Sequence, residues 1–224
     1  MSIAVVKGKV SNAGSEDLLT ASVFGPLRYL PFNEYLKPIL EQSRNLDGKN
    51  IQLPNSDDMP TLDFWPTRYR REPDLELEMP AMKIFVEVKF HSGKSGDGEH
   101  DQLANQYEDL YKSTDRKKAV IYLTKHRSMP KEELQKSISN VNPSSLTKKF
   151  QDSLFWLSWF DMWSFISMKN KQVSTHPEKL ILQDLCELME KQGLAHFTGF
   201  TITNKDVVRE SKEEKIFYNE QRKR

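Results

Sequence analysis

Apolar and polar residues alternate along one part of the chain in the way that β-strands require. Residues 74–78 place leucines between acidic residues, and residues 83–90 (KIFVEVKF) are rich in β-branched and aromatic side chains. Residues 79–82 (MPAM), between these two runs, contain a proline and are typical of a turn. This pattern predicts a β-hairpin.

Helical spacing of apolar residues predicts elements on both sides of the hairpin. Residues 15–30 form a candidate helix, with Ser15 as N-cap and acidic residues in the first turn. After the hairpin, residues 102–111 return to helical spacing, and residues 118–124 (KAVIYLT) predict a strand that is buried on both faces. The order helix, strands, helix, strand predicts an α/β or α+β fold, a mixed sheet flanked by helices.

The second half of the chain is expected to be rich in helices. The predicted helices cover residues 131–138, 145–168 and 177–192, and a short strand is expected at residues 195–203. We therefore expect residues 1–130 to form a core that contains the hairpin. Residues 131–224 would form a helical part that packs on this core or mediates association, and the two parts could belong to one continuous domain.

The composition is that of a globular protein with an ordinary core. The 224 residues are 37% hydrophobic and 29% charged, and the single Cys186 leaves no internal disulfide. The net charge of +1 neither indicates nor excludes a nucleic-acid-binding protein, because a local basic face matters more than the total. The most apolar stretch, residues 154–168, contains Asp161 and is shorter than the about 20 residues of a membrane span. We expect a cytoplasmic protein without a membrane contact.

The same stretch, residues 154–168, carries six aromatic side chains, among them three of the four tryptophans of the chain. Their spacing of three and four residues favours one face of a helix that packs in the core, and it makes base stacking the weaker interpretation. Apolar residues nearly encircle the predicted helix, so a surface for a homodimer or a partner subunit is the second interpretation.

The hairpin brings three charged side chains together. If its turn centres on Pro80 and Ala81, the numbers of paired residues sum to about 161, and Asp74 then faces Glu87. Glu87 and Lys89 are two residues apart on one strand and project from the same face. Two carboxylates and one ammonium therefore meet at one patch. The alternative is a surface ion pair, which would contribute only about 0–1 kcal/mol.

Two hard oxygen ligands from separate strands suit Mg²⁺, which prefers carboxylates, water and phosphate oxygens. The backbone carbonyl of Val88, between Glu87 and Lys89, is a candidate further ligand. Such a metal lowers the pKa of a bound water, and Lys89 would orient that water and stabilise developing charge. The residues Asp74, Glu87 and Lys89 thus predict phosphodiester hydrolysis.

The segments that carry these residues resemble a known family. Glu72-Pro73-Asp74, followed after twelve residues by Glu87-Val88-Lys89, resembles the PD-(D/E)XK signature of the restriction-endonuclease-like nucleases. The predicted first helix resembles the opening helix of these folds, where an acid such as Glu16 leans toward the metals. The predicted helix from Gln102 resembles the helix after the E-x-K strand, whose glutamine supports the site. Gln102 is the matching position, and Tyr107 is a weaker candidate.

The resemblance covers roughly residues 15–124 and implies an Mg²⁺-dependent endonuclease, with Mn²⁺ as a substitute metal. It implies DNA as the substrate, with RNA left open, and a role in prokaryotic defence, mobile-element biology or DNA processing. Backbone phosphates would meet basic residues near the site, and the alternative for these residues is a solvated face. The basic candidates are Arg68, Arg70, Arg71 and Lys94. Two alternatives stay open: a catalytically silent nuclease-like module, and a nuclease subunit that acts only within a multi-protein complex.

Overall fold

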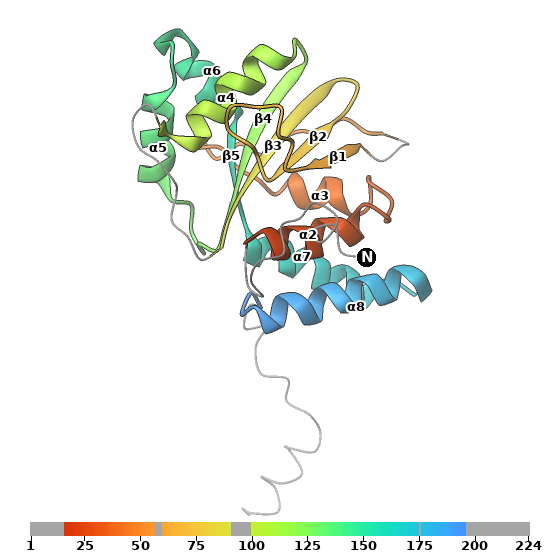
Figure 1. Ribbon diagram of the computed structural model, residues 1–224. Coiled ribbons are helices and arrows are strands. Elements are labelled where there is room, and N and C mark those ends of the chain that lie inside the picture. The colour runs from red at the N-terminus through yellow and green to blue at the C-terminus, as the bar shows by residue number, and fades with distance from the viewer. Residues whose placement is uncertain (1–15, 57–59, 91–99, 175, 196–224) are drawn as a thin grey trace, which may run out of the picture.

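A five-stranded mixed sheet forms the centre of the molecule (Figure 1). The computed structural model describes residues 16–56, 60–90, 100–174 and 176–195. The strands follow one another across the sheet in chain order, antiparallel from β1 to β3 and parallel from β3 to β5. Their bounds are β1 (Thr61–Phe64), β2 (Leu75–Glu78), β3 (Met82–Lys89), β4 (Lys117–Thr124) and β5 (Leu154–Ser158).

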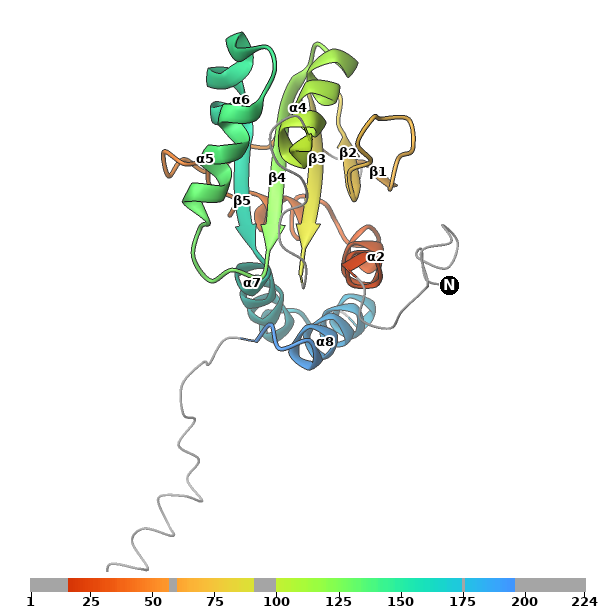
Figure 2. The same ribbon diagram turned by 60° about the vertical axis from the view of Figure 1, so that its left-hand side comes forward.

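Helices cover both faces of this sheet, as the sequence predicts for an α/β or α+β fold. The helices are α2 (Glu16–Leu27), α3 (Leu36–Leu40), α4 (Gln102–Ser113), α5 (Lys131–Asn140), α6 (Thr147–Ser153), α7 (Trp159–Gln172) and α8 (His176–Lys191), with a 3-10 turn at Ser144–Leu146. One face carries α4, α5 and α6, and the other carries α2, α3 and α7, with α8 packed on α2 and α7 (Figures 1 and 2). Figure 2 shows α2, α7 and α8 gathered around the carboxyl ends of β3, β4 and β5.

The predicted hairpin is confirmed together with its register. β2 and β3 pair antiparallel, and their partners run from Leu75↔Val86 to Glu78↔Lys83, so each pair of numbers sums to 161. The register holds because β3 is buried along its whole length, and a shift by one residue would move every apolar side chain to the opposite face.

The predicted helix over residues 145–168 is wrong in its middle. Residues Leu154–Ser158 form β5, which pairs in parallel with β4, and helices α6 and α7 flank it. A short apolar run reads alike as a buried helix segment or a buried strand, and here all five residues are buried between two helical layers. Residues after 130 therefore contribute a strand to the same sheet as the hairpin.

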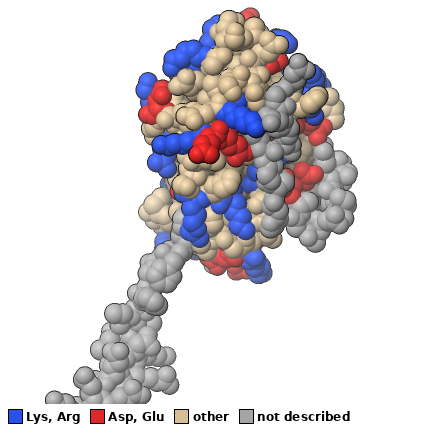
Figure 3. All heavy atoms as spheres, turned by 90° about the vertical axis from the view of Figure 1, so that its left-hand side faces the viewer, with Lys and Arg blue, Asp and Glu red and all other residues tan. Residues whose placement is uncertain are grey.

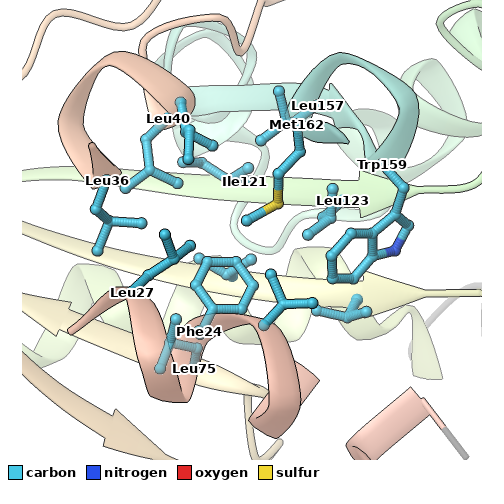
Figure 4. Packing of buried hydrophobic residues seen from close by; sticks show 14 of the residues in the cluster. Phe24, Leu27, Leu36, Leu40, Leu75, Ile121, Leu123, Leu157, Trp159 and Met162 are labelled. Atoms are coloured by element: carbon cyan, nitrogen blue, oxygen red, sulfur yellow. The ribbon is translucent and has the colours of Figure 1, made fainter. Parts of the chain in front are cut away.

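The aromatic residues of segment 154–168 pack in the core, as the favoured interpretation predicts. The rings of Trp156, Trp159, Phe160 and Trp163 are buried within this chain. Figure 4 shows Trp159 and Met162 of α7 beside Ile121 and Leu123 of β4. Phe165 is half-buried, and the alternative of a dimer or partner surface stays a prediction.

Other predictions concern the ends and the loops. Cys186 is buried on α8, in line with a structural thiol. No helix in the described ranges is long and apolar enough to cross a membrane. Ser15, Lys94 and nearly all of the predicted strand 195–203 lie outside the described residues.

Candidate functional site

The predicted site residues lie at the carboxyl end of β3. Glu87 and Lys89 are among the last three residues of this strand, and Glu16 is the first residue of α2. Asp74 immediately precedes β2, and the hairpin register carried one pair further places it opposite Glu87. In open α/β sheets, the carboxyl ends of parallel strands are the usual position for ligands.

Two of the acids cap the free edge of β3. Pairing with β2 stops at Leu75↔Val86, so the next amides on that edge lack a strand partner. The Val88 N–H donates to Asp74 Oδ2 at 2.7 Å, and the Phe90 N–H donates to Glu16 Oε2 at 2.5 Å. These bonds fix both carboxylates against the end of the strand.

The third acid, Glu87, points to the α4 side of the sheet and is 1% exposed. Its Oε1 accepts a hydrogen bond from Lys89 Nζ at 2.5 Å, and its Oε2 accepts one from Gln106 Nε2 at 2.7 Å. The same Lys89 Nζ lies 3.9 Å from Glu16 Oε1. The structure thus brings Glu16, Glu87 and Lys89 into contact, with Asp74 beside them on the neighbouring strand.

The charges of this group are unevenly balanced. Burial raises the pKa of Asp74 well above its usual range, and the Glu87 carboxylate adds to the increase. Burial also raises the pKa of Glu87, although Lys89 and Gln106 partly stabilise its ionised form. Burial opposes the charge on Lys89, but Glu87 overrides this effect and the pKa of Lys89 is raised. The Lys89 ammonium stays charged, whereas the ionised forms of Asp74 and Glu87 repel each other. The group therefore carries more negative than positive charge.

The glutamine of α4 that contacts Glu87 is Gln106, one turn later than Gln102, for which the resemblance predicts a supporting role. Gln102 is half-buried in the first turn of the helix, whereas Gln106 is fully buried beneath the sheet. Gln106 Oε1 is buried and has no hydrogen-bond partner among the described residues. The signal was present in the sequence, since Gln106 is a polar residue inside the buried stripe of α4. Tyr107, the weaker candidate, is buried in the cluster of residues on that face of the sheet.

The donor set is compatible with Mg²⁺ but does not form a closed cage. Across the described ranges, no three His, Cys, Asp or Glu side chains are close enough to hold a metal by themselves. Mg²⁺ needs less, because one or two carboxylates, waters and substrate phosphates complete its shell. Asp74 and Glu87 could supply these carboxylates. The N–H and C=O of one strand residue point to the same side, so the Val88 carbonyl also faces Asp74.

Two of the arginines predicted to bind phosphate form ion pairs with carboxylates. Arg68 pairs with Glu76 at 2.5 Å and with Asp63 at 2.6 Å. Arg70 pairs with Glu108 at 3.0 Å and also contacts Asn105. These ion pairs reduce the positive charge that either guanidinium can offer to a phosphate. The contact between Arg70 and Glu108 joins residues that are 38 positions apart in the sequence.

The Arg71 side chain remains exposed, and its backbone N–H donates to Asp109 Oδ2 at 3.3 Å. Phosphate binding stays a prediction for Arg68, Arg70 and Arg71 alike.

Two other basic residues stand next to the site. The parallel register Lys89↔Thr124 places Lys125 beside Phe90, and Lys125 Nζ lies 4.5 Å from the centre of that ring. Arg127 is exposed, and its Cζ lies 4.0 Å from the centre of the Phe160 ring. Lys125 follows β4 directly, and Arg127 comes two residues later. Both therefore lie near the carboxyl end of β4, which is the end of the sheet that also carries Glu87 and Lys89. The sequence shows them as basic residues, but only the parallel pairing of β3 and β4 brings them to the site.

Comparison with known proteins adds one relative. No family model matches the chain, and no solved structure matches it. An uncharacterized protein of Pasteurella multocida (strain Pm70) is 25% identical over 196 residues, which cover 82% of this chain and 70% of that protein. The name of this relative assigns no activity.

Proposed function

We propose that the chain is a metal-dependent nuclease of the PD-(D/E)XK kind, which hydrolyses phosphodiester bonds in DNA. The observation that carries this proposal is the acidic excess at the carboxyl end of β3, where Lys89 contacts Glu87 at 2.5 Å and Asp74 is on the adjoining strand. The order of α2, the hairpin, α4 and β4 also follows the order of segments on which the resemblance rests.

Each residue has a role that follows from its contacts. Asp74 and Glu87 would hold Mg²⁺, which supplies a Lewis acid that activates water and neutralises charge on phosphate oxygens. Lys89 stays charged beside Glu87. It would orient the attacking water and stabilise the negative charge that develops on the leaving group. Gln106 positions the Glu87 carboxylate from α4. Glu16 links the start of α2 to the end of β3.

The experiment is a cleavage assay on plasmid, linear duplex, single-stranded DNA and RNA with Mg²⁺ or Mn²⁺. Asp74→Asn and Lys89→Ala should each lower the rate about 100-fold or more, as expected for loss of a group that stabilises transition-state charge. Glu78→Gln is the matched control, because Glu78 lies on the same hairpin and pairs with Arg116 outside the site. Circular dichroism of each variant checks that the fold is retained.

Undiminished cleavage in both site variants would remove this assignment. Absence of cleavage by the unaltered chain, with DNA binding retained, would replace the proposal with a catalytically silent nuclease-like module. Cleavage that requires an added partner protein would favour a subunit of a larger complex. A preference for RNA over DNA would correct the substrate and leave the site in place.

A further inference from the structure

A pocket lies at the end of the sheet opposite the candidate site. It includes Met82 and Lys117, which begin β3 and β4, while Glu87 and Lys89 are near the end of β3. At about 3.3 Å per residue, the five to seven residues between them place the two sites roughly 20 Å apart. The pocket is open to solvent and has a volume of about 710 Å³, within the range of small-ligand sites.

Two lysines converge on one aromatic ring in this pocket. Lys118 Nζ and Lys149 Nζ each lie 5.0 Å from the centre of the Tyr111 ring. Lys149 Nζ also donates a hydrogen bond to the Tyr111 hydroxyl at 2.8 Å, and this contact lowers the pKa of that phenol. These three side chains come from β4, α6 and α4, so tertiary packing brings them together.

These lysines differ from the basic residues next to them in the chain. Arg116 pairs with Glu78 at 2.7 Å, and Lys148 pairs with Asp152 at 2.8 Å. Within the described part of the chain, neither Lys118 nor Lys149 has a carboxylate oxygen within 4.0 Å. Two ammonium groups thus share a neutral ring, and the other contact of Lys118 Nζ, to the Arg116 carbonyl at 3.1 Å, is with a neutral acceptor as well. An anion between them would supply the missing negative charge.

The remaining lining of the pocket combines buried apolar side chains with exposed polar ones. Ile51, Met82 and Phe155 contribute buried apolar side chains. Asp115 adds a carboxylate that can accept hydrogen bonds from N–H groups of a ligand, and Asp152 adds the oxygen that its ion pair with Lys148 does not use. Basic side chains are spread along the side of the molecule that carries α5 and α6 (Figure 3). The ligand that matches these walls has an anionic group, a flat ring and N–H donors at the ring's edge.

We propose that this pocket binds a mononucleotide, independently of the candidate metal site. The phosphate lies between Lys118 and Lys149, which donate charge-assisted hydrogen bonds to its oxygens. The base packs against Tyr111 and the apolar floor, and its amino or imino N–H groups face the acidic rim. A simple inorganic anion would use the lysines but leave the aromatic and apolar surface uncovered.

The test is isothermal titration calorimetry on the full chain in EDTA, with guanosine 5′-monophosphate, adenosine 5′-monophosphate and inorganic phosphate as probes. At least one nucleotide should bind about tenfold more tightly than phosphate, since burying a base adds more than about 1.4 kcal/mol. The double variant Lys118→Ala, Lys149→Ala should weaken nucleotide binding about tenfold or more. Tyr111→Leu should weaken nucleotide binding while leaving the weak phosphate binding unchanged.

Lys112→Ala is the matched control, because Lys112 is exposed on the same helix as Tyr111 and does not line the pocket. Equal binding of phosphate and both nucleotides would reduce the pocket to an unspecific anion site and overturn the proposal. So would nucleotide affinity that the double variant leaves unchanged, or the absence of heat at millimolar nucleotide. Binding of a single-stranded oligonucleotide at these lysines without mononucleotide binding would likewise replace the proposed ligand.

Discussion

Glu76 and Glu87 are buried carboxylates of the same hairpin, yet their surroundings are opposite. Each is 1% exposed. Glu76 accepts hydrogen bonds from Arg68 and from the Tyr69 hydroxyl, both at 2.5 Å, and Lys83 Nζ lies 3.2 Å away. One acid is therefore surrounded by two cations and a phenol. Its charge is satisfied by the protein alone.

Glu87 has the reverse balance. One cation, Lys89, serves both Glu87 and Glu16, and Asp74 adds another carboxylate on the adjoining strand. The pKa values of Asp74 and Glu87 are both raised, first by burial. The comparison teaches that burial of an acid is by itself no sign of function. An uncompensated group of acids is such a sign, because it is costly for folding and is relieved by a bound cation.

Removing the lysine of each group should give the largest contrast. Lys89→Met leaves Glu87 without a cation in contact, so we expect a loss of about 3 kcal/mol of unfolding free energy without metal. Lys83→Met leaves Glu76 with Arg68 and Tyr69, so the expected loss is about 1 kcal/mol. Urea unfolding in EDTA measures both values. Equal losses would mean that the two groups are equally compensated.

Neutralising one acid in each group should change stability in opposite directions. Asp74→Asn removes a carboxylate that its neighbours disfavour, and it should stabilise the metal-free protein by about 0.5–2 kcal/mol. Glu76→Gln removes the acceptor of two cations and should destabilise it by about 1–3 kcal/mol. Thermal and urea unfolding report the sign. Destabilisation by Asp74→Asn would contradict the proposed excess of negative charge.

Mg²⁺ should stabilise the protein through the acidic group alone. At ten times the dissociation constant, binding to the native state adds about 1.4 kcal/mol and raises the melting temperature. The increase should disappear in Asp74→Asn and persist in Glu78→Gln, and differential scanning fluorimetry detects both. A melting temperature that Mg²⁺ raises equally in the two variants would place the cation elsewhere.

The raised pKa of Asp74 should give the metal-free protein a contribution to stability that falls as pH rises above about 4. The pKa of Asp74 is raised in the native state, so between the unfolded value of about 3.9 and the native value the folded chain binds more protons. This contribution is fully present below the unfolded value and is lost as pH rises through the native value. Its slope is at most about 1.4 kcal/mol per pH unit for one proton.

Asp74→Asn should reduce this slope, leaving the part due to Glu87. Urea titrations between about pH 4 and 8 in EDTA measure the difference. A slope that is unchanged in the variant would show that Asp74 does not take up the proton.

The smallest expected contrast concerns the two sets of basic residues. Lys125→Ala should weaken DNA binding a few-fold and reduce the salt dependence by about one counterion, because Lys125 lies at the sheet edge of the site. Arg68→Ala should leave binding unchanged, because its guanidinium is held by Asp63 and Glu76. Fluorescence anisotropy with Ca²⁺ in place of Mg²⁺ separates binding from cleavage. The reverse result would restore Arg68 as a phosphate ligand.

Local patterns in the sequence were sufficient for the hairpin and its charged residues. Alternation along β2 and β3 sets which side chains share a face, and the turn sets the register, so the opposition of Asp74 and Glu87 follows from residues within one short segment. The role of Glu16 was predicted only through the family resemblance, because the helix dipole by itself also explains an acid at a helix start. The family resemblance rests on these same residues.

Contacts between distant segments decided the rest. The strand β5 is indistinguishable from a buried helix until its pairing with β4 is known. Whether Gln102 or Gln106 reaches Glu87 depends on how far α4 is shifted along the sheet, and the occupation of Arg68 and Arg70 depends on acids in other elements. The pocket around Tyr111 is formed by side chains from several elements that only the tertiary structure brings together. Sequence periodicity predicts which face of an element is apolar, whereas tertiary packing determines which residues contact that face.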